Sequence, residues 1–177
     1  SSRASLIAGA RRGSPALTTP RSPFDTRDTS DTRDTFDDLV LVSPDKGGIR
    51  RILLLASLLG NKVPCISIEK NRDLNTGEVK STRVDGEVKR RAIIVDDVIS
   101  TGKTLISAAE LLKKNGAEEI YVMATHGIFA GEAPEDLENS VIKKVIIADT
   151  IEVKKSRSFN KLHALSIADL IVDELRK

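Results

Sequence analysis

The chain has 177 residues, of which 28 are Lys or Arg and 26 are Asp or Glu, so its formal net charge is +2. A single Cys excludes an internal disulfide framework and a zinc site built from several cysteines. The balanced charge and the 3% of aromatic residues argue against a nucleic-acid partner. The longest apolar run, residues 52–56, is far shorter than the roughly 20 residues of a membrane-spanning helix, so no membrane partner is expected.

Residues 1–38 differ in composition from the rest of the chain. Residues 1–23 contain four Arg and no acid, and DTRDT occurs twice between residues 25 and 38. Neither part has the period of a strand or a helix, which predicts a low-complexity, disordered extension. The Arg- and Ser-rich opening also has the composition of an organellar transit segment. We therefore expect a folded domain over residues 39–177 and a cytoplasmic location, with an organelle as the alternative.

From residue 39 onward, short apolar runs alternate with helical patterns. The predicted strands cover residues 39–43, 65–69, 91–97, 119–125 and 145–149, and the predicted helices cover residues 49–59, 103–115 and 166–175. A polar segment, residues 70–87, follows the second strand. Strands that alternate with helices imply right-handed crossovers. The predicted fold class is α/β, a doubly wound and mainly parallel sheet flanked by helices.

The first candidate binding loop follows the first strand. In parallel sheets, ligands bind beyond the carboxyl ends of the strands, and paired glycines allow backbone N–H groups to face an anion there. The residues of this loop are Ser43, Pro44, Asp45, Lys46, Gly47 and Gly48. The sequence alone leaves a phosphate or pyrophosphate loop and an ordinary turn as alternatives.

The strongest motif is AIIVDDVISTGKTL, residues 92–105. A predicted buried strand delivers two adjacent carboxylates, Asp96 and Asp97, and a polar turn then opens a helix. Adjacent residues of a strand point to opposite sides, so at least one carboxylate faces the ligand crevice. The amides and hydroxyls of the turn would hold a phosphate, and the carboxylates would reach sugar hydroxyls or a bound metal. A Walker A loop is excluded because that motif needs Gly where Asp97 stands.

This run resembles the phosphoribosyl pyrophosphate binding signature of type I phosphoribosyltransferases and phosphoribosyl pyrophosphate synthetases. Four further segments favour the synthetases: SPDKGG, IEKNRD, THGIF and ADTI, at residues 43–48, 68–73, 125–129 and 148–151. The closing LSIADLI is also similar. Residues 38–177 resemble the C-terminal half of a synthetase, closest to archaeal-type members. The resemblance implies a type I phosphoribosyltransferase-like fold.

The resemblance implies transfer of a pyrophosphoryl group from MgATP to ribose 5-phosphate, which gives phosphoribosyl pyrophosphate and AMP. It implies that Lys70 and Arg72 are catalytic, in a mobile loop that closes over the site, and that Asp45 helps to place Mg²⁺. The residues implied for ribose 5-phosphate are Asp96, Asp97, Ser100, Thr101, Gly102, Lys103 and Thr104. Family members form oligomers, so self-association is expected. The segments that hold ATP in the other half of a synthetase have no counterpart here, so the ATP site is expected to be incomplete.

Two other functions stay open at this stage. Lys103 stands where synthetases usually have Gly, and Thr-Gly-Lys-Thr is familiar from purine phosphoribosyltransferases, so such a transferase is one alternative. The other is a noncatalytic regulatory subunit that associates with an active synthetase. His126 has no metal-ligand spacing, and we interpret it as a hydrogen-bonding residue at a strand end rather than a catalyst.

Overall fold

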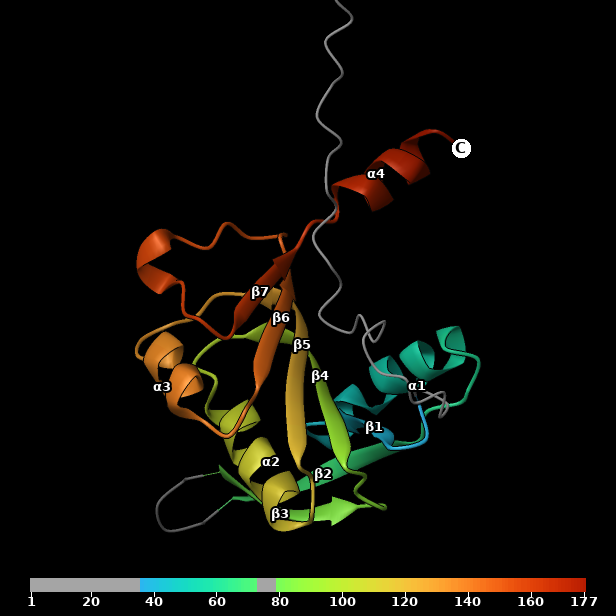
Figure 1. Ribbon diagram of the computed structural model, residues 1–177, viewed down its shortest axis with the longest axis vertical. Coiled ribbons are helices and arrows are strands. Elements are labelled where there is room, and N and C mark those ends of the chain that lie inside the picture. Colours follow the sequence, from blue (N-terminus) through green and yellow to red (C-terminus); the bar gives the residue numbers. More distant parts are fainter. Residues whose placement is uncertain (1–35, 73–78) are drawn as a thin grey trace, which may run out of the picture. The chain divides into compact units, whose positions relative to one another are not determined.

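The computed structural model describes residues 36–72 and 79–177, and for residues 70–72 and 79–81 it describes the backbone only. A seven-stranded sheet has the order β3-β2-β1-β4-β5-β6-β7 (Figure 1). The strands are β1 (Leu39–Ser43), β2 (Cys65–Arg72), β3 (Val79–Asp85), β4 (Arg91–Ile99), β5 (Glu119–Gly127), β6 (Lys144–Ala148) and β7 (Leu162–Leu165). The β2–β3 pair is antiparallel and the other pairs are parallel. The carboxyl ends of β1, β4, β5 and β6 therefore meet at one edge of the sheet.

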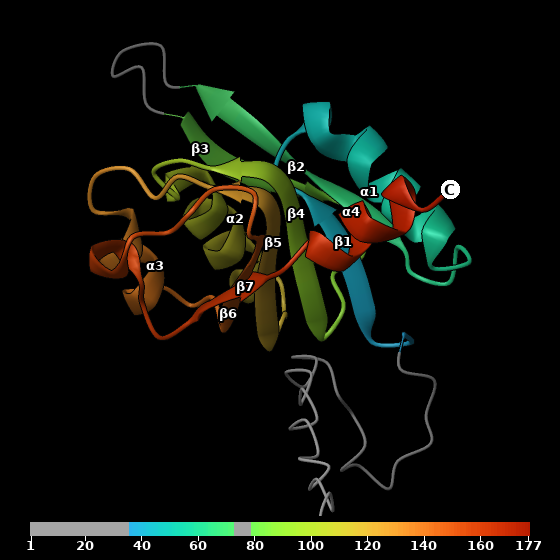
Figure 2. The same ribbon diagram turned by 90° about the horizontal axis from the view of Figure 1, so that it is seen from above.

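Helices lie on both faces of the sheet. They are α1 (Ile49–Leu58), α2 (Lys103–Lys114), α3 (Ala133–Asn139) and α4 (Ala168–Leu175), and two 3₁₀ turns, η1 (Lys46–Gly48) and η2 (Lys155–Arg157), lie between elements. Figure 2 shows α1 on one side of the sheet and α2 and α3 on the other. This arrangement confirms the predicted doubly wound fold class.

The alternation of side chains along the central strands builds two cores. Val40 and Val42 of β1 pack in the cluster that contains the buried face of α2, whereas Leu39 and Leu41 pack against Ile52 of α1. Because both faces are covered, β1 is apolar up to Ser43, and β4 carries the apolar run of residues 92–95. The strands that lead to the carboxyl edge of the sheet are thus packed on both faces.

Most predicted elements are confirmed, and β1 has the predicted bounds. In the segment 70–87, for which we predicted only polar character, β2 continues to Arg72, and β3 forms an antiparallel hairpin with it. The elements α3 and β7 were not predicted. The proposed extension, residues 1–38, lies mostly outside the described residues, and Phe36 packs against the α1 core. Within the described residues, no helix has the length and apolar character needed to cross a bilayer.

Candidate functional site

The first loop of the site joins β1 to α1 through η1. The hydroxyl of Ser43, which is fully buried, donates a hydrogen bond of 2.6 Å to the carbonyl of Asp45. The Asp45 carboxylate accepts a bond of 3.1 Å from the N–H of Gly48. A Cβ atom on Gly48 would lie 2.5 Å from the Ser43 hydroxyl oxygen, so this turn requires glycine there. The loop is a compact turn whose shape depends on Ser43, Asp45 and Gly48 together.

The other predicted residues of this loop have different surroundings. Pro44 is buried, whereas Lys46 and Gly47 are exposed. The Lys46 ammonium lies 2.9 Å from a carboxylate oxygen of Glu69, on β2. This ion pair lowers the pKa of Glu69 and raises that of Lys46, because a hydrogen bond stabilises both charged forms. It connects the turn to the strand segment that precedes Lys70.

The second loop joins β4 to α2. Gly102 has φ +75°, in the left-handed region, and an added Cβ atom would lie 3.2 Å from Leu137 of α3. No side chain caps the N-terminus of α2, so the N–H groups of its first turn remain available to an anion. Ser100, Thr101 and Thr104 are exposed around this turn. The turn therefore has the geometry of an open phosphate cradle.

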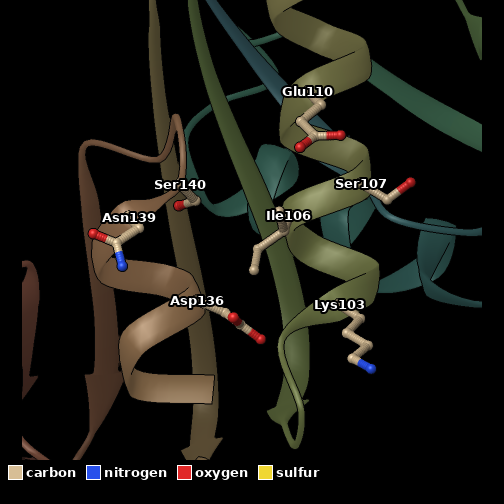
Figure 3. Close-up of a pocket in the computed structure, with 7 residues that line it drawn as sticks. All are labelled: Lys103, Ile106, Ser107, Glu110, Asp136, Asn139 and Ser140. Atoms are coloured by element: carbon tan, nitrogen blue, oxygen red, sulfur yellow. The ribbon is translucent and has the colours of Figure 1, made fainter. Parts of the chain in front are cut away.

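Lys103 begins α2 beside this cradle. Its exposed side chain extends away from α3 in Figure 3, at the rim of a groove of roughly 380 Å³ between α2 and α3. The charge of this lysine adds to the positive potential at the helix N-terminus. A lysine at this position is compatible with phosphate binding.

The two acids at the end of β4 share one partner. A guanidinium nitrogen of Arg51 lies 3.2 Å from Asp96 Oδ1, and the other terminal nitrogen lies 2.9 Å from Asp97 Oδ2. Asp96 also accepts a bond of 2.9 Å from the N–H of Asp97, and Asp97 accepts one of 2.9 Å from the N–H of Val98. Arg51 comes from α1, so the ion triad joins that helix to the carboxyl end of β4.

The two carboxyl groups of the triad titrate differently. Burial raises the pKa of Asp96, because desolvation disfavours its charged form. The more exposed Asp97 has a lowered pKa, caused first by a hydrogen bond with the Asp96 carboxyl group and then by the charge of Arg51. The Asp97 side chain is 62% exposed and that of Asp96 is 21% exposed, so Asp97 is the more accessible acceptor for a ligand.

The predicted catalytic residues lie on the β2–β3 hairpin. The backbone of Lys70 pairs with Ser81 and that of Arg72 with Val79, and the register shifts between Glu69 and Lys70. These backbones form a strand where a loop was expected. The side chains of Lys70 and Arg72, like residues 73–78, lie outside the described residues, and the catalytic role of both stays a prediction.

His126 stabilises the strand ends. Its Nδ1 atom lies 2.7 Å from the hydroxyl of Thr150, which itself donates a bond of 2.8 Å to the carbonyl of Thr125. The hydroxyl hydrogen is used by Thr125, so His126 donates to Thr150 and connects β5 to the segment after β6. The structure thus confirms the interpretation of His126 as a hydrogen-bonding residue.

Sequence reasoning missed three partners at this site: Arg51, Glu69 and Thr150. Among the described residues, no three His, Cys, Asp or Glu side chains form a group that could hold a metal ion. Mg²⁺ commonly uses only one or two carboxylates and takes its other ligands from substrate phosphates and water. The single turn carboxylate of Asp45 fits that mode of binding.

Comparisons with known proteins show the family of the chain. Residues 63–177 match the family described as phosphoribosyl synthetase-associated domain. The ribose-phosphate pyrophosphokinase of Clostridium acetobutylicum is 41% identical over 143 residues, which cover 80% of this chain and 44% of that protein. The one from Aquifex aeolicus is 44% identical over 138 residues, which cover 78% of this chain and 43% of that protein.

A solved structure extends the comparison to the fold. The phosphoribosylpyrophosphate synthetase from Mycobacterium smegmatis is 36% identical, with a TM-score of 0.68 over 78% of this chain and 44% of that one. The chain thus spans less than half of the length of these relatives. The resemblance predicted from the sequence is confirmed, and the chain belongs to the phosphoribosyl synthetase-associated domain family.

Proposed function

We propose that this chain provides the ribose 5-phosphate-binding part of a ribose-phosphate pyrophosphokinase. The observation that carries the proposal is the end of β4, where Asp96 and Asp97 precede the uncapped N-terminus of α2. Carboxylates suit the hydroxyls of a ribose ring, and a helix N-terminus suits its 5-phosphate. The names of the relatives, which are ribose-phosphate pyrophosphokinases, support the same assignment.

In the proposed reaction, the anomeric oxygen of ribose 5-phosphate attacks the β-phosphorus of ATP. The new oxygen–phosphorus bond forms as the bond from the β-phosphorus to the α,β-bridging oxygen breaks. AMP leaves with that oxygen, and the anomeric proton is released. Such a transfer depends mainly on positioning and on neutralisation of charge. Mg²⁺, when bound, would supply part of that neutralisation.

In this proposal, different segments of the chain bind different parts of the substrates. The turn of residues 100–104 holds the 5-phosphate, Asp97 and Asp96 hold the ribose hydroxyls, and the turn of residues 43–48 receives the pyrophosphoryl group, with Asp45 toward Mg²⁺. Lys70 and Arg72, on the β2–β3 hairpin, would cover the transferred group. Self-association and a cytoplasmic location are part of this proposal.

The test is AMP release from MgATP with and without ribose 5-phosphate, with Asp97→Ala as the control variant. Release that depends on the sugar phosphate and disappears in the control would support the full reaction. If no AMP is released, calorimetric titration with ribose 5-phosphate decides between a binding domain and no function at this site. Lys70→Ala is expected to keep ribose 5-phosphate affinity within a few-fold and to lose AMP release.

A further inference from the structure

The ion triad consists of Arg51, Asp96 and Asp97, and the proposed function gives no role to Arg51. Arg51 contacts both Asp96 and Asp97, at 3.2 and 2.9 Å. Its neighbour Arg50 is exposed and makes no ion pair with any described residue. One arginine of an adjacent pair therefore reaches the candidate binding site, and the other remains at the surface.

The local structure leaves room for this contact. A Cβ atom on Gly48 would lie 3.1 Å from an Arg51 guanidinium nitrogen, so the glycine of the first loop allows Arg51 its position. The side chains of Arg51 and Asp96 are 34% and 21% exposed, and both line a mainly apolar cavity of roughly 390 Å³. The triad is ordered by partial burial yet remains accessible from the surface.

The net charge of the triad affects which ligands it can bind. Two ionised carboxylates and one guanidinium carry a net charge of −1, whereas the acids alone would carry −2. A sugar diol is neutral and cannot compensate the repulsion between two adjacent carboxylates. A cation that stays with the acids lowers this repulsion, and we therefore expect it to favour the binding of a neutral diol.

We infer that Arg51 is a positioning residue for the sugar: it stays on Asp96 and Asp97 as a built-in counter-cation and fixes their oxygens for the ribose hydroxyls. A guanidinium suits this role because its planar fork reaches two carboxylates at once. The inference rests on the proposed function for the identity of the sugar, but the counter-cation role can be tested without it.

The first experiment measures ribose 5-phosphate affinity by calorimetry, with and without Mg²⁺. Without divalent ions, Arg51→Gln is expected to bind about tenfold more weakly than the unaltered chain, and Arg50→Gln to bind equally well. Mg²⁺ is expected to recover most of the affinity of Arg51→Gln, because it replaces the missing charge. Arg51→Lys keeps a charge but loses the planar fork of the guanidinium. Its affinity for ribose 5-phosphate should lie between those of Arg51→Gln and the unaltered chain.

The second experiment uses no sugar. In a titration of the protein with Mn²⁺, Arg51→Gln is expected to bind the ion several-fold more tightly than the unaltered chain, because its two acids are uncompensated. The gain should disappear in the double variant Arg51→Gln, Asp97→Asn. Thermal unfolding of every variant verifies that the fold is retained, and Arg51→Met, which also removes the charge, provides the test if Arg51→Gln does not fold.

The outcomes separate the two proposals. Loss of sugar affinity that Mg²⁺ repairs, together with tighter Mn²⁺ binding, supports the role of Arg51. Unchanged Mn²⁺ affinity in a folded Arg51→Gln variant overturns it, as does a loss of sugar affinity that Mg²⁺ leaves unrepaired. If no variant and not even the unaltered chain binds ribose 5-phosphate, the proposed function fails, and the Mn²⁺ titration still decides whether Arg51 compensates the acids.

Discussion

At the scale of single residues, Gly47 and Gly48 stand side by side in the first loop but have different surroundings. A Cβ atom on Gly48 would meet the buried Ser43 hydroxyl at 2.5 Å, whereas one on Gly47 would meet only the carboxylate end of Asp45, at 3.2 Å. Gly48→Ala is therefore expected to lower the free energy of unfolding by about 1–3 kcal/mol, a typical effect of overpacking. Urea denaturation measures the change.

Gly47→Ala is the matched control for this prediction, because neither glycine has a positive φ and both changes add one methyl group. The Asp45 carboxylate can shift by rotation, so we expect a clearly smaller loss of stability. Equal losses in the two variants would contradict the assignment of the close approach to Gly48.

Arg51 shows what the sequence could not reveal at this scale. The loops that bear Asp96, Asp97 and Gly102 were identifiable because their residue types and spacing carry chemistry within a few positions. Arg51 lies 45 residues before Asp96, and nothing in the pair Arg50–Arg51 distinguishes the partner of the acids from the exposed neighbour. Their contact depends on how α1 packs against β4, which is a tertiary property.

At the scale of elements, α1 connects the core to the site. Ile52 is fully buried against β1, next to Arg51, whereas Leu54 is 64% exposed. Ile52→Ala is expected to lower the free energy of unfolding by about 2–4 kcal/mol, because it removes buried methylenes and leaves a cavity. Leu54→Ala should change it by less than about 0.5 kcal/mol. Chemical denaturation of both variants measures these changes in the free energy of unfolding. A large loss of stability for Leu54→Ala would indicate that α1 packs differently.

The start of β5 provides a prediction about pH. Glu119 accepts hydrogen bonds from Lys143, at 2.7 Å, and Tyr121, at 2.8 Å, and the first of these is the main cause of its lowered pKa. A carboxyl group whose pKa is lowered by folding stabilises the protein above its ordinary pKa, and this contribution is lost as the pH falls through the lowered value. Glu119→Gln should therefore cost about 0.5–1 kcal/mol at pH 7 and progressively less in acid.

Denaturation at several pH values measures this difference between Glu119→Gln and the unaltered chain. Glu118→Gln is the control, since the Glu118 carboxylate lies 3.6 Å from Arg90 with both side chains largely exposed. A cost for Glu119→Gln that stayed constant down to acidic pH would show that the carboxylate charge contributes nothing.

The elements that sequence reasoning found and missed differ in a physical way. The central strands β1 and β4 are buried on both faces and read as continuous apolar runs, so they could be identified. The sequence of β3, VKSTRVD, mixes charged and polar residues because this strand lies at the edge of the sheet, and it was taken for part of a polar segment. The seven-residue α3 and the four-residue β7 are too short to show a period.

At the scale of the whole molecule, the sheet couples ligand binding to folding. Both candidate loops follow central strands, β1 and β4, whose buried faces form the two cores on opposite sides of the sheet. The site therefore exists only in the folded chain, and a ligand that binds there stabilises the fold according to its concentration and affinity. This linkage allows the site to be tested even where no AMP is released.

Ribose 5-phosphate at about 100 times its dissociation constant should stabilise the fold by about 2.7 kcal/mol, which corresponds to a rise in Tm of roughly 5–10 °C. Asp97→Asn should lose most of this rise, because the ribose hydroxyls lose an acceptor, whereas Asp173→Asn on the exposed helix α4 should keep it. Inorganic phosphate has no ribose hydroxyls to contact Asp97 and can use only the phosphate loops at residues 43–48 and 100–104. It should therefore give a smaller rise that is equal in the unaltered chain and Asp97→Asn. A full rise with phosphate alone would mean that the acids contribute nothing to binding, and that the pair at the end of β4 serves the structure through Arg51 only.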